Sequence, residues 1–241
     1  FQILCGLFLV VSYSSCMHSE EDKVDVLIIG GGASGVTSGI QSARMGANTL
    51  ILEESTWLGG MLTSAGVSAV DGNYRLPAGL WGEFKNRLSD YYGGLDSLKT
   101  GWVSNVLFEP SVGNKILHEM VAAENNLKVW KQACLEEVKR TGDEWVAKVK
   151  VEGQGVKTVR AKVMIDATEL GDVAKICGVK YDIGMESRDD THEDIAPEKK
   201  NNIVQDITYV AILKDYGKDV TIPEPEGYDP KEFACACASQ V

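Results

Sequence analysis

The chain has little positive charge. Its 24 Lys and Arg residues are outnumbered by 35 Asp and Glu residues, which gives a formal net charge of -11 over 241 residues. Nucleic acid binding needs basic side chains to replace the counterions of the phosphates, so we expect no nucleic acid partner. Internal repeats and low-complexity segments are lacking as well, which argues against a repeat architecture.

Patterns typical of metal ligands are also lacking. Cys235-Ala-Cys237 offers two thiols, too few for a metal site, and is interpreted as a redox pair or as partners of disulfides elsewhere. His118 lies in an expected helix, where a packing or surface role is predicted, and His192 lies in a charged segment. Cys134 and Cys177 have apolar neighbours and are predicted to be buried, unreactive thiols. No residue receives a catalytic assignment.

The sequence does contain the pattern of a dinucleotide site. Val24 to Ile29 is an apolar run of the kind that is buried on both faces of a parallel sheet. Gly30 then allows a tight turn, Gly32 lets the backbone approach a pyrophosphate, and Gly35 lets the next helix pack against the strand. The start of that helix offers unpaired N–H groups and a partial positive charge to phosphates.

The residues after this turn continue the pattern. Gly35, Gly39 and Ala43 form a stripe of small residues that permits close contact between the helix and a sheet. Asn48 to Leu52 reads as a second strand, and Glu53 at its end can hold ribose hydroxyls. Glu53 alone suits either NAD or FAD.

Two further segments favour FAD. Glu54 to Gly66 begins just after the ribose acid and contains Gly59-Gly60. Much later, Val163 to Asp172 reads as a buried strand that ends in Asp-Ala-Thr and runs into a helix. This three-part pattern resembles the FAD-dependent oxidoreductases of the glutathione-reductase-like flavoprotein superfamily. Over about residues 24 to 188 the chain is most similar to the bacterial FAD-dependent oxidoreductase family.

The resemblance implies FAD as the cofactor and gives each motif a role. The first turn would approach the pyrophosphate, Glu53 would bind the adenosine ribose, and Gly59-Gly60 would run along the flavin side. Ala133 or Cys134 would contact adenine through backbone atoms, and the turn near Thr168 would lie close to the phosphates. The implied cofactor-binding residues are Gly30, Gly32, Ala33, Ser34, Gly35, Glu53, Gly59, Gly60, Ala133, Cys134, Thr168, Gly171 and Asp172.

One position departs from the family pattern. Many relatives have Ala-Thr-Gly at the second turn, whereas this chain has Ala167-Thr-Glu169. A glutamate is tolerated there if its side chain points to solvent.

The middle of the chain predicts further helices and strands. The expected helices are Leu80 to Tyr92 and Ser111 to Glu124, the second with Pro110 just ahead of it. The expected strands, which alternate or run apolar, are Leu127 to Lys131, Ala133 to Arg140, Glu144 to Val151 and Val156 to Ile165. The fold class is therefore α/β: a Rossmann-like FAD-binding domain with a parallel sheet and an antiparallel β-meander inserted before the return strand.

The first residues suggest export. Phe1 to Val11 is an apolar stretch that is too short to span a bilayer and suits a signal-peptide core. Tyr13-Ser-Ser-Cys16 resembles a bacterial lipobox, in which Cys16 becomes lipidated, and the acidic run Ser19-Glu-Glu-Asp22 follows. We expect a protein anchored by lipid to the bacterial cell envelope, periplasmic or at the cell surface. The alternative is a buried N-terminal strand with an ordinary cysteine.

These sequence features together predict that the chain has four parts. Residues 1–16 are expected to be a signal peptide with a lipobox, 17–23 an acidic linker, 24–188 the FAD-binding domain and 189–241 the start of a substrate domain. In the last part, Ile203 to Leu213 reads as one strand, and three prolines from Pro223 on indicate an extended loop. We expect the chain to be the N-terminal portion of a longer protein, with most catalytic residues outside it.

The functional prediction is an FAD-dependent oxidoreductase that accepts a hydride or electron pair from a small organic substrate. The substrate and the electron acceptor are not indicated by any motif. Two alternatives stay open from the residues. One is an NAD(P)-dependent oxidoreductase, and the other is a non-catalytic surface lipoprotein that binds a nucleotide or another ligand.

Overall fold

The computed structural model describes residues 21–100, 104–205, 210–211 and 214–233. The chain forms two units, residues 1–210 and 211–241, and each is described by itself. In the second unit, the regular structure among the described residues is one short 3-10 helix, Pro230–Phe233.

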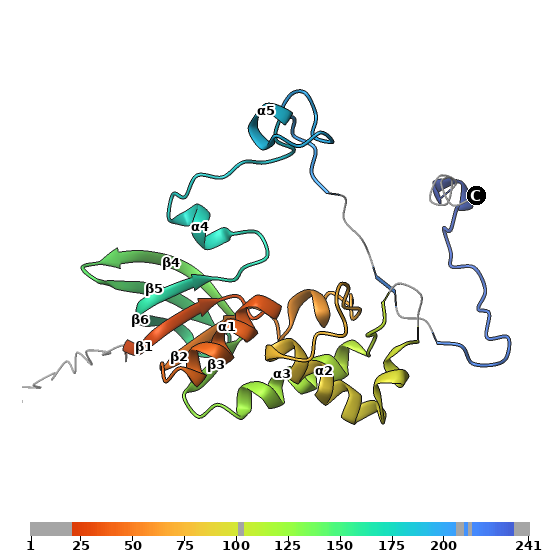
Figure 1. The fold of residues 1–241 in the computed structure, drawn as a ribbon, viewed down its shortest axis with the longest axis horizontal. Helices are drawn as coiled ribbons and strands as arrows, with labels where there is room; N and C mark the ends of the chain where they lie inside the picture. The colour runs from red at the N-terminus through yellow and green to blue at the C-terminus, as the bar shows by residue number, and fades with distance from the viewer. Residues whose placement is uncertain (1–20, 101–103, 206–209, 212–213, 234–241) are drawn as a thin grey trace, which may run out of the picture. The chain divides into compact units, whose positions relative to one another are not determined.

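A six-stranded sheet with the order β3-β2-β1-β6-β5-β4 forms the centre of the first unit (Figure 1). Its strands are β1 (Glu21–Ile29), β2 (Thr49–Glu53), β3 (Leu127–Lys131), β4 (Ala133–Thr141), β5 (Glu144–Val151) and β6 (Gly155–Asp166). The pairs β3-β2, β2-β1 and β1-β6 are parallel, whereas β6-β5 and β5-β4 are antiparallel. This confirms the α/β fold with a parallel sheet and an antiparallel meander.

Strand β6 belongs to both parts of the sheet, which the sequence did not indicate. It pairs in parallel with β1, with Ile29 opposite Asp166, and it pairs antiparallel with β5, with Trp145 opposite Ala161. The meander is therefore not a separate insert before the return strand, because its third strand is the return strand. Strand β1 also begins at Glu21, inside the segment predicted as a linker, and Arg160 of β6 pairs with Glu21 there.

The three long helices among the described residues cover one face of the sheet. They are α1 (Ala33–Arg44), α2 (Gly79–Tyr92) and α3 (Pro110–Ala122); shorter helices are α4 (Asp172–Ile176), α5 (Arg188–Thr191), η1 (Gly60–Leu62) and η2 (Leu95–Leu98). The predicted bounds of α2 and α3 agree with these to within two residues. Pro110 is the first residue of α3, where its fixed φ suits a helix and its missing N–H leaves no bond unmade.

The alternation of side chains along β1 separates two apolar clusters. Ile28 packs with Ile40 of α1 and with residues of α2 and α3 on one face. Leu27 and Ile29 point to the other face, where they pack with Val149 and other residues of the meander. Both faces of β1 are thus covered from Leu27 to Ile29, as the apolar run predicted, whereas Val24 and Val26 are only half-buried. Gly39, in the small-residue stripe, lies so close to β2 that an added Cβ would come within 2.6 Å of Ile51 Cδ1.

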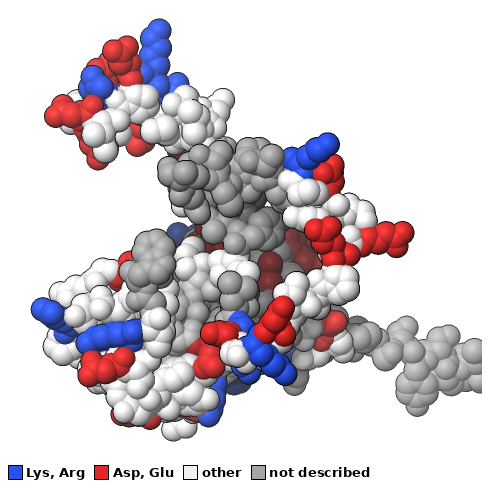
Figure 2. All heavy atoms as spheres, turned by 90° about the vertical axis from the view of Figure 1, so that its right-hand side faces the viewer, with Lys and Arg blue, Asp and Glu red and all other residues white. Residues whose placement is uncertain are grey.

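Charged side chains of both signs are mixed on the surface. On the face shown in Figure 2, Lys and Arg side chains lie beside Asp and Glu side chains. Arg44, for example, pairs with Glu83 at 2.9 Å and with Glu124 at 2.7 Å, which ties α1 to α2 and to the end of α3. Exposed pairs of this kind each contribute little to stability, about 0 to 1 kcal/mol.

Several predictions concern the two ends of the chain. The lipobox with Cys16 and the pair Cys235-Ala-Cys237 lie outside the described residues. The strand predicted over residues 203–213 is wrong where the structure describes it, because residues 203–205 and 210–211 have no strand structure. Among the described residues, no helix combines the length and apolar character needed to cross a membrane.

Candidate functional site

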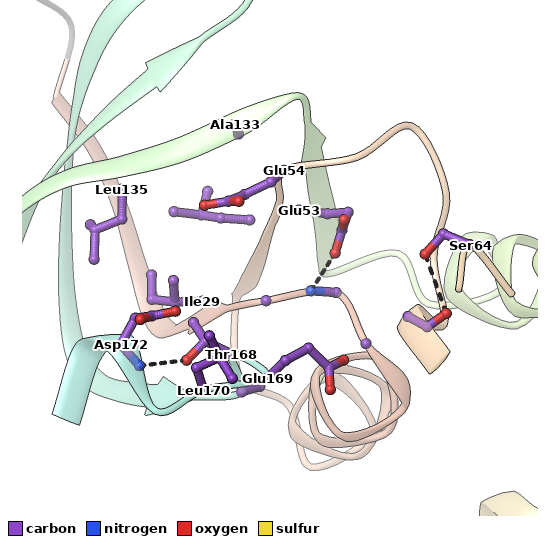
Figure 3. Close-up of a pocket in the computed structure, with 16 residues that line it drawn as sticks. Ile29, Glu53, Glu54, Ser64, Ala133, Leu135, Thr168, Glu169, Leu170 and Asp172 are labelled. Carbon is purple, nitrogen blue, oxygen red and sulfur yellow. Dashed lines mark hydrogen bonds between the residues drawn. The ribbon is translucent and has the colours of Figure 1, made fainter. Parts of the chain in front are cut away.

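A cavity of about 260 Å³ opens at the carboxyl ends of β1, β2 and β6 (Figure 3). The carboxyl ends of parallel strands are where ligands bind in open α/β sheets. Sixteen residues line it: Ile29, Gly30, Gly31, Gly32, Leu52, Glu53, Glu54, Gly60, Ser64, Ala133, Leu135, Ala167, Thr168, Glu169, Leu170 and Asp172. They come from the turns after β1, β2 and β6 and from the start of β4.

Two glycines of the motif, Gly30 in the turn after β1 and Gly35 in α1, are required by the fold itself. Gly30 has φ +101°, a backbone conformation that favours glycine, and an added Cβ would lie 2.4 Å from the carbonyl oxygen of Ala167. At Gly35 an added Cβ would lie 1.9 Å from the carbonyl oxygen of Gly30. These distances are far below van der Waals contact with backbone atoms, so neither position can accept a side chain without moving the chain.

Gly32 is different, because the fold does not require a glycine there. Its φ is -64° and its ψ is -173°, which any residue adopts. The atoms near an added Cβ belong to the carboxylate of Glu169, with Oε1 at 2.9 Å, and this side chain is exposed and flexible. The absence of a side chain at Gly32 leaves bare backbone facing the cavity, which fits the close approach of a ligand.

The start of α1 lies at the same place and has no side-chain cap among the described residues. Gly32 is the N-cap residue of this helix. The first N–H groups of a helix have no partner within it, and they carry a partial positive charge. Together with the bare backbone of Gly32, this end of α1 suits a phosphate group.

Glu53 lies at the end of β2 with its carboxylate held in place. One carboxylate oxygen accepts a hydrogen bond from the backbone N–H of Gly31 at 2.8 Å, and the other accepts one from the N–H of Ser55 at 2.7 Å. Figure 3 shows the bond to Gly31, which links the carboxylate to the glycine turn. The structure therefore places the predicted ribose acid directly beside the predicted pyrophosphate turn.

The turn after β6 is held together by a side chain. Asp166 accepts hydrogen bonds from the backbone N–H and the hydroxyl of Thr168, at 3.0 and 2.7 Å, and from the N–H of Ala174 at 2.8 Å. The Thr168 hydroxyl in turn accepts from the N–H of Asp172 at 2.8 Å. Burial of Asp166 favours its neutral form, but these hydrogen bonds outweigh burial and lower its pKa.

Glu169 lies closer to the first turn than expected. Its side chain is exposed, but its carboxylate reaches the start of α1 instead of pointing away into solvent (Figure 3). The oxygen Oε1 lies 2.9 Å from the position of an added Cβ on Gly32 and 2.7 Å from that on Gly60. The departure from the family pattern at this position thus brings a carboxylate between the two glycine turns.

The structure brings about half of the predicted cofactor residues together around the cavity. Those that line it are Gly30, Gly32, Glu53, Gly60, Ala133, Thr168 and Asp172. Those that do not line it are Ala33, Ser34, Gly35, Gly59, Cys134 and Gly171. Each of these is next in sequence to a lining residue or, for Ser34 and Gly35, lies in the first turn of α1. Their contacts with the cofactor stay predictions.

The geometry of β4 shows which of its first two residues, Ala133 or Cys134, faces the cavity. Side chains alternate along a strand, so Ala133 and Leu135 face the cavity and Cys134 faces away. Ala133 is buried, whereas the thiol of Cys134 is exposed, as is that of Cys177. The prediction that both cysteines are buried was wrong, because apolar neighbours in the sequence do not determine what covers the face of β4 that carries Cys134, or the C-cap of α4, which is Cys177.

Other lining residues were missed by sequence reasoning. These are Ile29, Gly31, Leu52, Glu54, Ser64, Leu135, Ala167, Glu169 and Leu170. Some had a signal: Gly31 lies between two motif glycines, and Leu135 comes two residues after Ala133, so it lies on the same face of β4. Ser64 lies in the segment Glu54 to Gly66 that favours FAD, but nothing singled out this residue within it, since its place depends on how the loop after β2 folds back. Neither His118 of α3 nor the exposed His192 lines the cavity.

The lining is acidic. Among the described residues that form it, Glu53, Glu54, Glu169 and Asp172 carry carboxylates, and none is Lys, Arg or His. A pyrophosphate bound here would therefore be held by backbone N–H groups and by the dipole of α1, not by basic side chains.

Comparison with known proteins gives a family match over most of the chain. Residues 25–239 match the family model described as FAD dependent oxidoreductase. No curated protein matches the sequence.

Solved structures with a similar fold are distant in sequence. They include p-nitrophenol 4-monooxygenase from Pseudomonas putida DLL-E4, with 15% identity, a TM-score of 0.45, and 69% of this chain and 46% of that chain covered. A flavoprotein/dehydrogenase from Cytophaga hutchinsonii has 17% identity, a TM-score of 0.49, and coverage of 65% and 42%. A geranylgeranyl bacteriochlorophyll reductase-like protein from Thermoplasma acidophilum has 17% identity, a TM-score of 0.48, and coverage of 74% and 49%. The chain spans less than half the length of each.

Proposed function

This chain belongs to the FAD dependent oxidoreductase family, with FAD as its cofactor, and we propose that the cavity beside the glycine turn is the FAD site. In this proposal the chain is the cofactor-binding part of an enzyme that takes a hydride or electron pair from a small organic substrate. An acceptor of unspecified chemistry then receives the electrons. The bound flavin supplies the redox chemistry, and the protein binds and orients it.

The observation that carries the proposal is Gly32. The fold explains Gly30 and Gly35 completely, but it leaves Gly32 without a structural reason to be glycine. A bare backbone that faces a cavity at an uncapped helix start is what a closely approaching pyrophosphate requires.

The chain's own residues divide the task of holding the cofactor. The start of α1 and Gly32 would bind the pyrophosphate through backbone N–H groups, and Glu53 would accept hydrogen bonds from ribose hydroxyls. Ala133 and Leu135 offer an apolar wall for the adenine. The Gly59-Gly60 turn would lie along the flavin side of the cofactor.

Absorbance of the purified full-length protein, supplied with FAD and desalted, tests the proposal. We expect wild type to retain a two-band yellow spectrum and Gly32→Val to lose it, with circular dichroism unchanged. Gln41→Ala on the exposed side of α1 serves as the matched control and should retain the flavin.

Two results would contradict the proposal. Gly32→Val that binds FAD as well as wild type would remove the glycine turn from the site. A folded, colourless wild type that binds NADPH or NADH would favour the nicotinamide alternative. The non-catalytic alternative predicts a function that survives Gly32→Val, so any ligand or partner activity that persists in this variant would support it.

We also propose that the protein is exported and anchored by a lipid on Cys16. The support is the sequence alone: the apolar stretch from Phe1 to Val11 precedes Tyr13-Ser-Ser-Cys16 and the acidic run after it. Labelling of cells with a radioactive fatty acid should mark wild type, and Cys16→Ala should abolish the label because it removes the thiol that carries the lipid. Equal labelling of Cys16→Ala would reject the lipid anchor.

The domain division is likewise a proposal. Residues 24–188 would form the FAD-binding domain, and residues 189–241 would begin a substrate domain. Limited proteolysis with FAD bound should cut first after residue 188 and leave the flavin on the N-terminal product. Early cleavage within residues 24–188 would contradict this boundary.

A further inference from the structure

Glu169 places a negative charge where the proposed function places the cofactor's pyrophosphate. Its Oε1 atom lies 2.9 Å from an added Cβ on Gly32 and 2.7 Å from one on Gly60, so the carboxylate lies between the two glycine turns. Figure 3 shows the side chain reaching from the turn after β6 toward the start of α1. The carboxylate oxygen thus lies where a side chain on Gly32, the N-cap of that helix, would begin.

The carboxylate has no partner that would neutralise it. No hydrogen bond or ion pair joins Glu169 to another of the described residues, and the lining of the cavity they form contains no basic side chain. The nearest favourable charge is the positive end of the α1 dipole, which attracts any anion that lies there. Only one anion at a time can occupy the space next to this helix end.

We propose that Glu169 competes with the pyrophosphate of FAD for the start of α1 and must turn away when the cofactor binds. This inference rests on the proposed FAD site. In the protein without cofactor, the Glu169 carboxylate interacts with the positive end of α1. A bound pyrophosphate places negative charges within a few Å of it, and like charges at such distances repel. Glu169 therefore weakens FAD binding and makes it depend on salt.

The Glu169 side chain can rotate without disturbing the fold. Glu169 is exposed, so its rotation into solvent displaces no packed neighbour. The turn beneath it is fixed, because Asp166 holds the N–H and hydroxyl of Thr168, and the Thr168 hydroxyl holds the N–H of Asp172. The movement is thus confined to the Glu169 side chain and leaves the backbone of the turn in place.

The test measures the dissociation constant of FAD by quenching of its fluorescence at low and high salt. Glu169→Gln removes the charge and keeps the shape. We expect it to lower the dissociation constant about five- to tenfold at low ionic strength. At about 1 M salt the Debye length is about 3 Å, so the difference from wild type should fall to about twofold. Wild type itself should bind FAD more tightly as salt is added.

A matched control separates this local effect from a change in net charge. Glu136→Gln changes the formal charge by the same amount, but Glu136 is exposed on β4 and does not line the cavity. Its dissociation constant for FAD should stay within about twofold of wild type.

The outcomes are distinguishable. An unchanged or raised dissociation constant in Glu169→Gln would overturn the inference while the FAD site stands, and a raised one would mean that Glu169 contacts the cofactor favourably. An equal gain in Glu136→Gln would also overturn it, since net charge would then be the cause. If neither wild type nor Glu169→Gln binds FAD, the proposed function fails, and this inference fails with it.

Discussion

The turns after β1 and after β6 lie side by side at the cavity, and each leads from a parallel strand into a helix. The first turn consists of glycines, and at Gly30 its backbone lies directly against the backbone of Ala167. The second turn, from Ala167 to Asp172, is fixed by the carboxylate of Asp166 and the hydroxyl of Thr168. The helix after the first turn has 12 residues, whereas the one after the second has 5.

This difference separates two ways to hold a loop beside a ligand. Close backbone contacts at Gly30 and Gly35 hold the first turn, with one side-chain hydrogen bond from the Gly31 N–H to Glu53, and the first N–H groups of α1 have no partner within the helix. Side-chain hydrogen bonds hold the second turn, and they consume the N–H groups that a ligand could otherwise use. The first turn is therefore suited to bind phosphates, and the second is suited to support the first. The following changes test this comparison in order of their expected effect on stability.

The largest effect is expected for Gly35→Ala. Helix propensity alone predicts that alanine stabilises a helix by about 1 kcal/mol relative to glycine. The structure predicts the opposite sign, because the added Cβ would lie 1.9 Å from the carbonyl oxygen of Gly30. We expect a loss of about 3 kcal/mol or more in the free energy of unfolding, measured by urea denaturation. Gln41→Ala on the same helix should change it by less than about 0.5 kcal/mol, and a stabilised Gly35→Ala would refute the close packing.

Asp166→Asn should have the next largest effect. The amide keeps the shape but loses the charge that accepts hydrogen bonds from Thr168 and from the N–H of Ala174. Hydrogen bonds to charged groups contribute about 1.5 to 3 kcal/mol, so we expect a loss of about 2 kcal/mol in the free energy of unfolding. A change below about 0.5 kcal/mol would show that the second turn does not depend on this side chain.

The same residue predicts a dependence on pH. Because the pKa of Asp166 is lowered in the folded protein, its contribution is fully present above the pKa of the unfolded chain, about 3.9, and is lost as pH falls through the lower folded value. The difference in stability between wild type and Asp166→Asn should thus be constant from about pH 5 to 7 and shrink below about pH 4. Urea denaturation at several pH values measures it, and a difference that grows in acid would contradict the assigned direction.

These turns also show what a sequence reveals and what it does not. The glycine turn was predicted because most of its requirements are local: a strand, the positive φ of Gly30, and the close contact between Gly35 and Gly30; only the contact between Gly30 and Ala167 is distant in sequence. The support from Asp166 was not predicted, because its partners are recognisable only once the turn after β6 has folded. The position of Glu169 depends on two turns that are more than 100 residues apart in sequence. Neither spacing nor periodicity contains that information.

The sheet shows the same limit. Every strand of the first unit was predicted to within about three residues, because alternation and apolar runs are local signals. The pairing of β6 with both β1 and β5 could not be read from them, since it depends on which strands meet. The exposure of Cys134 follows from the same cause: alternation predicts that it faces away from Ala133, but not that its face of the sheet is uncovered at this point.

A smaller effect is expected for Thr168→Val, which keeps the branched shape and removes the hydroxyl. It breaks the bond from the hydroxyl to Asp166 and frees the N–H of Asp172, which solvent can then reach. We expect a loss of about 1 kcal/mol in the free energy of unfolding. Combined with Asp166→Asn, the two losses should not add, because the residues share one network, and additive losses would show that they act separately.

The smallest effect on stability is expected for Gly32→Ala, although Gly32 belongs to the same motif as Gly35. Its φ of -64° suits alanine, and the nearest obstacle is the carboxylate of Glu169, which can turn away. Alanine is a poorer N-cap than glycine, but it also reduces the entropy of the unfolded chain, and the two effects are of similar size. The free energy of unfolding without FAD should therefore stay within about 0.5 kcal/mol of wild type. The stabilisation of wild type by added FAD should be largely lost in the variant, because the new methyl group faces the cavity. Thermal unfolding with and without FAD measures both quantities, and a variant that is destabilised without FAD would place Gly32 with Gly30 and Gly35 as a requirement of the fold.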